Sequence, residues 1–151
     1  MDLNGSYSFN APPERVFDLM VDPKIVAACL PGCEQLEALG ENRYRAVLSM
    51  GIAAITGRYE GVVELQDLER PVSYKMLVEG KGKPGFVKGG GEVRLSATES
   101  GTKVEFSGKA QVGGAIARVG QRLMGAASKV MTDKFFACLE SKLAEQEPSG
   151  G

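Results

Sequence analysis

The pattern of side chains changes once along this chain, near residue 113, and that change restricts the folds available to it. From residue 44 to residue 112, apolar and polar residues alternate in short runs, which is typical of antiparallel strands with one buried and one solvated face. After Gly113-Gly114, apolar residues recur at helical spacing from Ala115 to about Leu143. Strands followed by one long amphipathic helix predict that the helix lies across the apolar face of a curved sheet.

The segments before residue 44 add smaller elements. Residues 3–9 alternate as a first strand, and a short strand is expected at 34–39. Pro12-Pro13 opens a short helix over 14–20, and a second short helix begins with Asp22 as N-cap and ends near Leu30. The chain is therefore predicted to be α+β: a strongly curved antiparallel sheet of about seven strands, two short helices, and one long C-terminal helix across the concave face. Residues 1–145 form one predicted domain, and 146–151 form a polar, flexible tail.

Composition excludes several classes of function. The net charge of −1 argues against a nucleic-acid binder, and no stretch reaches the length of a membrane span. Histidine is absent, and no nucleophile–base pair or metal-ligand set is recognisable, so we expect no catalytic residue, no metal and no cofactor. Three cysteines without a secretion signal predict a reducing, cytosolic setting in which they are small buried thiols.

A glycine-rich segment between two predicted strands has the spacing of a dinucleotide-binding motif. Gly80 to Gly85 reads G-x-G-x-x-G, but a nucleotide site needs such a loop to open a helix. We therefore interpret it as a mobile hairpin connection, with Gly89-Gly90-Gly91 marking a bulge or a close backbone approach. Lysines surround an apolar tip there, which suits a membrane surface or an acidic partner; a plain solvated loop is the alternative.

The inward set of side chains mixes methionine, aromatic and very small residues. Methionine-lined surfaces accept varied apolar ligands, whereas the simpler interpretation is a solid core, and both remain open here. Gly61, Gly108 and Ala110 on the sheet, with Gly120 and Ala127 on the helix, remove volume where the two layers meet. Because glycine within a helix costs about 1 kcal/mol relative to alanine, Gly120 requires either close helix–sheet contact or room for a ligand.

Four segments together resemble a known family. They are Asp22-Pro23 through Cys29-Leu30-Pro31-Gly32-Cys33-Glu34; Gly51-Ile52-Ala53-Ala54 with Gly57-Arg58-Tyr59; Gly82-Lys83-Pro84-Gly85-Phe86-Val87-Lys88-Gly89; and Ala110-Gln111-Val112-Gly113-Gly114 with Gly120-Gln121-Arg122-Leu123. The chain resembles the carbon monoxide dehydrogenase G-subunit family, within the START-like (polyketide cyclase and lipid-transfer) superfamily of helix-grip folds. The resemblance implies a hydrophobic cavity under the last helix and an accessory role beside a molybdenum-containing carbon monoxide dehydrogenase or related hydroxylase. It also implies a cytoplasmic location with peripheral recruitment to the membrane, and a lipid or a quinone as guest.

Our leading hypothesis is a non-enzymatic protein that binds a hydrophobic, quinone-like or lipid-like molecule between sheet and helix. The predicted lining residues are Leu48, Met50, Tyr59, Tyr74, Met76, Phe86, Phe106, Leu123, Met124, Ala127 and Met131. The two tyrosine hydroxyls are expected to meet a polar head group, and Phe86 with Val87 is expected at the mouth.

Two other functions stay open at this stage. One is an interaction module that docks on a hydroxylase or on anionic lipid and holds no ligand. The predicted partner or membrane contacts are Lys81, Lys83, Val87, Lys88, Arg118, Arg122 and Lys129. The other is a cyclase or hydrolase on the same scaffold, which would need an acid–base group inside the cavity.

Overall fold

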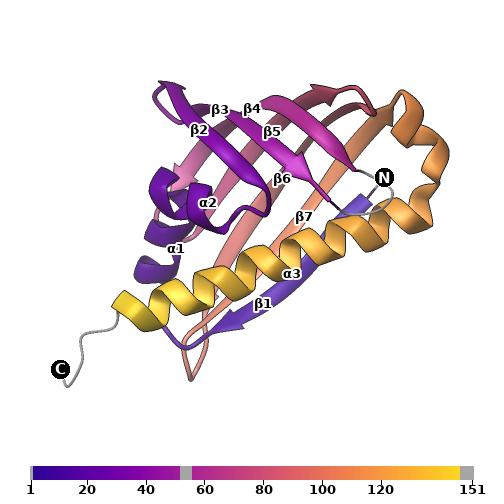
Figure 1. The fold of residues 1–151 in the computed structure, drawn as a ribbon. Helices are drawn as coiled ribbons and strands as arrows, with labels where there is room; N and C mark the ends of the chain where they lie inside the picture. The colour runs from indigo at the N-terminus through magenta and orange to yellow at the C-terminus, as the bar shows by residue number, and fades with distance from the viewer. Residues whose placement is uncertain (1, 52–55, 147–151) are drawn as a thin grey trace.

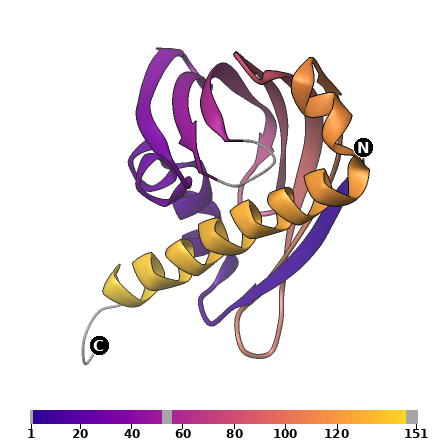
Figure 2. The same ribbon diagram turned by 45° about the vertical axis from the view of Figure 1, so that its right-hand side comes forward.

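The computed structural model describes residues 2–51 and 56–146, without the side chains of residues 121 and 146. Seven strands form one antiparallel sheet in the order β1-β7-β6-β5-β4-β3-β2 (Figure 1). The strands are β1 (Asp2–Phe9), β2 (Cys33–Gly40), β3 (Arg43–Met50), β4 (Gly57–Glu69), β5 (Ser73–Gly82), β6 (Gly85–Ala97) and β7 (Thr102–Gly113). The predicted α+β fold is confirmed: the sheet curves strongly, and one long helix crosses its concave side (Figure 2). Residues 52–55, of which 52–54 belong to the second of the four segments that carry the resemblance, and the predicted tail from 147 onward lie outside the described residues.

The glycine-rich segment forms a hairpin of two long strands. Gly80 and Gly82 lie in β5, and Gly85 begins β6, so the G-x-G-x-x-G spacing does not open a helix. The register between β5 and β6 runs without a shift from Ser73↔Arg94 to Gly82↔Gly85. The predicted hairpin connection is therefore present but limited to residues 83–84. No bulge interrupts 89–91, because the neighbouring strands hold these glycines in regular pairing. A close approach of backbones is present instead: a Cβ on Gly89 would lie 2.5 Å from the carbonyl oxygen of Lys109.

Two short helices close one end of the curved sheet. α1 (Pro13–Val21) follows Pro12, and α2 (Pro23–Cys29) begins after Asp22, whose side chain accepts a hydrogen bond from the backbone N–H of Lys24 at 2.9 Å. This is an N-cap with proline in the first turn, as the sequence predicts.

The predicted C-terminal helix is interrupted at Gly120. Ala115–Val119 forms a short 3-10 helix (η2), and α3 (Gln121–Gln146) follows it. Gly120 has φ 93° and ψ 152°, a conformation that is essentially restricted to glycine, and a Cβ there would meet nothing within 4 Å. Gly120 is thus explained by the break between two helices. It makes no close helix–sheet contact and does not line the cavity described below, so neither of the two predicted reasons applies.

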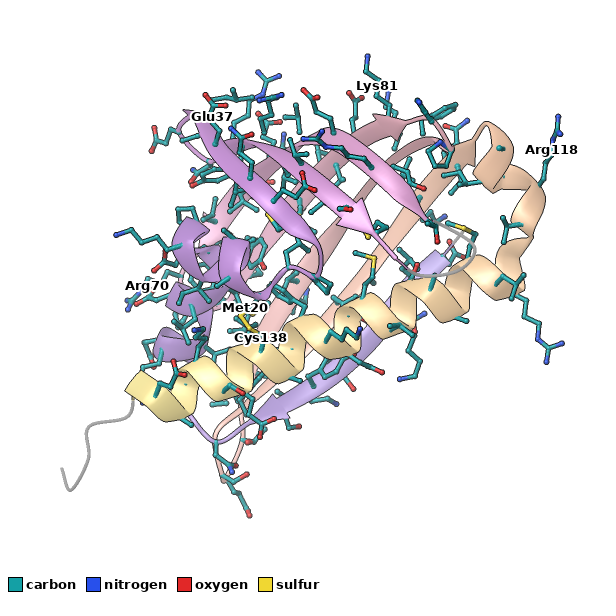
Figure 3. All side chains as sticks on the ribbon, in the orientation of Figure 1. Met20, Glu37, Arg70, Lys81, Arg118 and Cys138 are labelled. Carbon is teal, nitrogen blue, oxygen red and sulfur yellow. A yellow bond between two sulfur atoms is a disulfide. The ribbon has the colours of Figure 1, made fainter. Side chains whose placement is uncertain are left out.

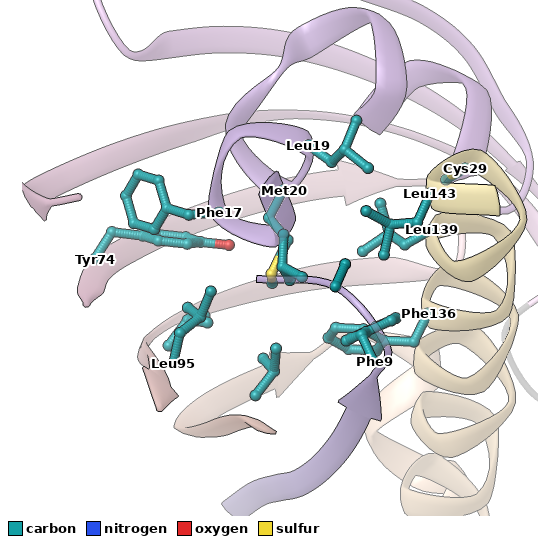
Figure 4. Close-up of a cluster of buried hydrophobic side chains, with 14 residues drawn as sticks. Phe9, Phe17, Leu19, Met20, Cys29, Tyr74, Leu95, Phe136, Leu139 and Leu143 are labelled. Atoms are coloured by element: carbon teal, nitrogen blue, oxygen red, sulfur yellow. The ribbon is translucent and has the colours of Figure 1, made fainter. Parts of the chain in front are cut away.

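The largest core lies where the C-terminal half of α3 meets α1, α2 and the sheet (Figure 4). Its members include Phe9, Val16, Phe17, Tyr74, Val104, Phe136, Leu139 and Leu143. Thr102, the first residue of β7, is fully buried, and its hydroxyl donates to the carbonyl of Ala11 at 2.7 Å.

A disulfide ties α2 to α3 beside this core. Cys29 and Cys138 are bonded, with their Cα atoms 5.3 Å apart, while Cys33 is a free thiol. The prediction of three unpaired thiols is therefore wrong for two of them. The end of α2 packs against α3, and this places the two cysteines together although 109 positions separate them in the sequence.

Candidate functional site

A cavity of about 680 Å³ lies between the first half of α3 and strands β1, β5, β6 and β7. Its size falls in the range of about 300–1,000 Å³ that is usual for small-molecule sites. The lining comprises residues 2–7 of β1; Met76 and Val78 of β5; Val87, residues 89–92 and Val93 of β6; Phe106 and residues 107–110 of β7; and Gly125, Ser128, Lys129, Thr132 and Asp133 of α3. The long helix therefore roofs the sheet here without filling the space beneath it.

Missing side chains create this space. Along the inner face of β6 and β7, where larger residues would normally project, the chain places Gly89 and Gly91 beside Ala110 and Gly108. On the helix, Gly125 also faces the cavity, and a Cβ at this position would meet no atom within 4 Å. The expectation that Gly108 and Ala110 remove volume holds at this site, whereas Gly61 is not part of its lining.

Aromatic rings form one wall of the cavity. Tyr7 stacks on Phe136 with ring centroids 4.1 Å apart, and Phe106 lies nearly parallel to Phe136 at 6.0 Å. Gly5 makes room for this arrangement, since an added Cβ would lie 2.7 Å from the Phe106 ring. A second apolar cluster, separate from the largest core, contains Tyr59, Ile116, Met124 and Ala127, with Val87 packed against it.

The cavity also has a polar wall, formed by β1 and α3. The Tyr7 hydroxyl donates to the Asp133 carboxylate, and its oxygen lies 3.3 Å from Thr132 Oγ1. Lys129 Nζ lies 2.8 Å from the other carboxylate oxygen of Asp133. Burial and the Asp133 contact raise the pKa of Tyr7, while the bonds from Lys129 and Tyr7 lower the pKa of Asp133. At neutral pH the wall therefore carries a neutral phenol, a carboxylate and an ammonium group.

The predicted lining residues lie in three environments. Met76 and Phe106 line the cavity. Tyr59, Met124 and Ala127 belong to the second apolar cluster, against which Met50 and Met131 pack. Leu48 lies on β3, where it pairs with Tyr59. Tyr74 lies in the largest core with its ring against Phe17, and burial raises the pKa of the Tyr74 hydroxyl. Leu123 and Phe86 lie on the outside, 56% and 43% exposed.

The predicted contact residues are dispersed. Val87 and Lys129 line the cavity. Lys81 and Lys88 border a second hollow of about 340 Å³, together with Arg45 and Phe86, on the outer face of the sheet, where Lys88 pairs with Glu79 at 3.3 Å. Lys83 lies in the turn between β5 and β6. Arg118 projects from η2, and Arg122 is exposed on α3; Figure 3 shows Arg118 and Lys81 pointing away from the fold.

Sequence reasoning missed the polar wall. Tyr7 had a usable signal, because it shares the inward parity of Leu3, Gly5 and Phe9. Ser128 and Thr132 had none, since a helix face is assigned to the core by its apolar residues. Leu123, which was predicted to line the cavity, is exposed, and α3 presents Gly125, Ser128 and Thr132 to the cavity instead.

Two further properties bear on the chemistry. Among the residues described, no three histidine, cysteine, aspartate or glutamate side chains are grouped as a metal site would require. No helix within the described ranges is both long and apolar enough to cross a bilayer.

Comparisons with known proteins place this geometry in context. A family model for the G-subunit of carbon monoxide dehydrogenase (CoxG) matches residues 5–144. A conserved protein from Geobacillus kaustophilus of known crystal structure is 36% identical, with 96% of each chain covered and a TM-score of 0.93. Proteins from Thermus thermophilus (18% identity, 98% and 100% covered, TM-score 0.74) and Rhizobium leguminosarum (19%, 97% and 95%, 0.73) share the fold. No curated protein matches the chain.

Proposed function

The chain belongs to the carbon monoxide dehydrogenase G-subunit (CoxG) family, and from this premise we propose that it is a non-enzymatic accessory protein that holds a hydrophobic small molecule beneath α3. The cavity of about 680 Å³ is the observation that carries the proposal. Glycines on β6, β7 and α3 keep this space open, and apolar side chains such as Met76, Val87 and Phe106 line it. A guest would be driven in by burial of its apolar surface, about 25 cal/mol per Å² before ordering costs.

The guest that we propose is quinone-like or lipid-like. Both classes combine an apolar body with a small polar head, and the cavity offers an apolar interior with a polar wall at Tyr7, Thr132 and Asp133. The rings of Tyr7 and Phe106, which line the cavity and lie roughly parallel, suit either a flat ring or an acyl chain. The family name supports a carbon monoxide dehydrogenase as the protein partner, and the partner that we propose is the molybdenum-containing enzyme or a related hydroxylase.

A helix substitution tests the cavity without disturbing the fold. Gly125→Leu places a side chain into open space in the cavity and removes a helix-destabilising glycine, so the variant should be at least as stable as the parent. A guest that needs the same space should bind about tenfold to a hundredfold more weakly, since overfilling a packed site costs about 1–3 kcal/mol. Ala126→Leu is the matched control, because residue 126 is exposed on the same helix.

The assays are native mass spectrometry of the gently purified protein, and calorimetric titration with decylubiquinone and with palmitate. We expect binding by the parent and by Ala126→Leu, and weakened binding by Gly125→Leu with an undiminished melting temperature. If the parent retains no guest and binds neither probe, the proposal of a carrier is wrong. Equal binding by Gly125→Leu and Ala126→Leu would show that the guest binds at another site.

Exposed side chains on α3 favour a second candidate function, docking on an anionic membrane surface. Leu123 and Val130 are 56% and 39% exposed and lie two turns apart on one helix face, each preceded by a basic residue, Arg122 and Lys129. Sedimentation with phosphatidylserine-containing vesicles tests this candidate. Arg122→Gln with Leu123→Ser should release the protein, whereas Leu77→Ser, at an exposed leucine on β5, should not. An unmodified protein that stays in the supernatant would exclude it.

A further inference from the structure

The cavity is asymmetric in its hydrogen-bonding capacity. We propose that it selects apolar guests whose polar group donates a hydrogen bond, an alcohol, a phenol or a quinol, over carbonyl or ether analogues that can only accept. This inference rests on the proposed function, because it assigns the head-group chemistry of the same cavity. It follows from the partners to which the hydroxyl protons of Tyr7, Ser128 and Thr132 are already donated.

The two helix hydroxyls have no proton to spare. Ser128 Oγ donates to the carbonyl of Met124 at 2.9 Å, and Thr132 Oγ1 donates to the carbonyl of Lys129 at 3.1 Å. A hydroxyl carries one proton and two acceptor lone pairs. With the proton directed back along α3, each oxygen presents only acceptor capacity to a guest.

The Tyr7 hydroxyl is engaged in the same way. A carboxylate can only accept, so the short contact between Tyr7 and Asp133 uses the tyrosine proton. Asp133 accepts from Tyr7 on one oxygen and from Lys129 on the other, and a carboxylate has about four acceptor sites, so roughly two remain. The lowered pKa of Asp133 and the raised pKa of Tyr7 keep both groups in these roles at neutral pH.

The remaining donors of the wall discriminate less. The ammonium group of Lys129 keeps N–H bonds beyond the one given to Asp133, but its side chain is 75% exposed and water can satisfy them. The open edge of β1 offers backbone N–H and C=O groups alike, so it favours neither kind of guest. Ser128 and Thr132 are half-buried, and the Asp133 side chain is 46% exposed, less than that of Lys129. These three side chains therefore set the preference, and all three accept.

The test uses pairs of guests that differ in one proton. 2-Naphthol and 2-methoxynaphthalene share a ring system and an oxygen acceptor, but only the naphthol donates. Calorimetric titration of the full chain should give a dissociation constant about tenfold lower for 2-naphthol, because a hydrogen bond to a charged acceptor is worth about that factor or more. Decylubiquinol and decylubiquinone, compared without oxygen, form a second pair and should show the same order.

Variants assign the preference to the wall. Asp133→Asn replaces acceptor capacity by an amide that also donates, so the ratio of the two dissociation constants should fall toward one. Glu140→Gln makes the same chemical change at an exposed position of α3 outside the cavity and should leave the ratio unchanged. Tyr7→Phe releases an acceptor site on Asp133, so the preference should persist or increase. Because each result is a ratio for one protein, partial unfolding cancels.

The outcomes separate this inference from the function on which it rests. Tight but equal binding of both members of each pair, or a preference for the ether and the quinone, overturns the donor rule and leaves a carrier. A preference that survives Asp133→Asn unchanged also overturns it. Failure of all four probes, and of palmitate as well, removes the carrier itself.

Discussion

Breaking the disulfide between α2 and α3 should cost this protein a large part of its stability. The bond joins residues 109 positions apart, and closing a loop of that length removes about 4.8 kcal/mol of conformational freedom from the unfolded chain in the chain-entropy model. Cys29 is buried with 4% exposure, so Cys29→Ala and Cys138→Ala are preferred to serine, which would add the cost of burying a hydroxyl. For a domain of this size, the loss corresponds to a fall of about 10–20 °C in melting temperature.

Thermal unfolding followed by circular dichroism measures the effect, with and without a phosphine reductant. Cys33→Ala is the matched control, because Cys33 is a free thiol and its replacement leaves the bridge intact. Each bridge variant, and the reduced parent, should unfold at a similarly lowered temperature, and the reductant should have no further effect on the bridge variants. A reduced parent within about 1 kcal/mol of the oxidised protein would refute the entropic reasoning. The bridge leaves Cys33 as the one free thiol, so three reactive thiols in the untreated protein after denaturation would refute the bridge.

Three further outcomes follow from single residues. Thr102→Val should destabilise the fold by about 1–2 kcal/mol in urea denaturation, because it deprives the buried Ala11 carbonyl of its donor; an unchanged midpoint would show that the bond contributes nothing. Gly120→Ala should cost about 1–3 kcal/mol, since φ 93° disfavours any side chain, and a stabilised variant would mean that η2 and α3 can merge. Hydrogen bonds from Lys129 and Tyr7 hold the pKa of Asp133 below its ordinary value, so Asp133 stays an acceptor until the pH falls below about 3.9. The preference for 2-naphthol should therefore be constant from about pH 5 to 8 and weaken only below about pH 3.9. Calorimetric titrations at several pH values check this, and a loss of the preference with a midpoint near neutral pH would contradict it.

Side-chain alternation was sufficient to predict most of the sheet. In runs such as 59–66 and 104–112, apolar and polar side chains alternate because one face of the strand is buried and the other is solvated. Their pattern therefore predicts a strand directly. The hairpin between β5 and β6 was predicted, but the full length of its two strands was not predictable in this way. Its glycines have no side chain to report a face, and the neighbouring strands, which sequence periodicity does not contain, impose their extended conformation.

The candidate site was predictable only in its general position. Small residues at 108 and 110 correctly indicated missing volume beneath a helix. The orientation of that helix was misjudged, because an apolar arc is assigned to the core, whereas here Ser128 and Thr132 turn inward and meet Tyr7 from a distant strand. The pairing of Cys29 with Cys138 likewise depends on tertiary proximity that no local pattern encodes.

The order of strands in the sheet has a consequence for synthesis. β1 pairs only with β7, in a register that joins Asp2 to Lys109 and Phe9 to Thr102, whereas β2 to β7 follow one another as successive hairpins. The hairpins can form as the chain leaves the ribosome, but contacts between segments as remote as β1 and β7 form slowly. Until β7 is available, the unpaired β1 is prone to aggregate. A ribosome must therefore translate most of this polypeptide before its opening segment can find a partner.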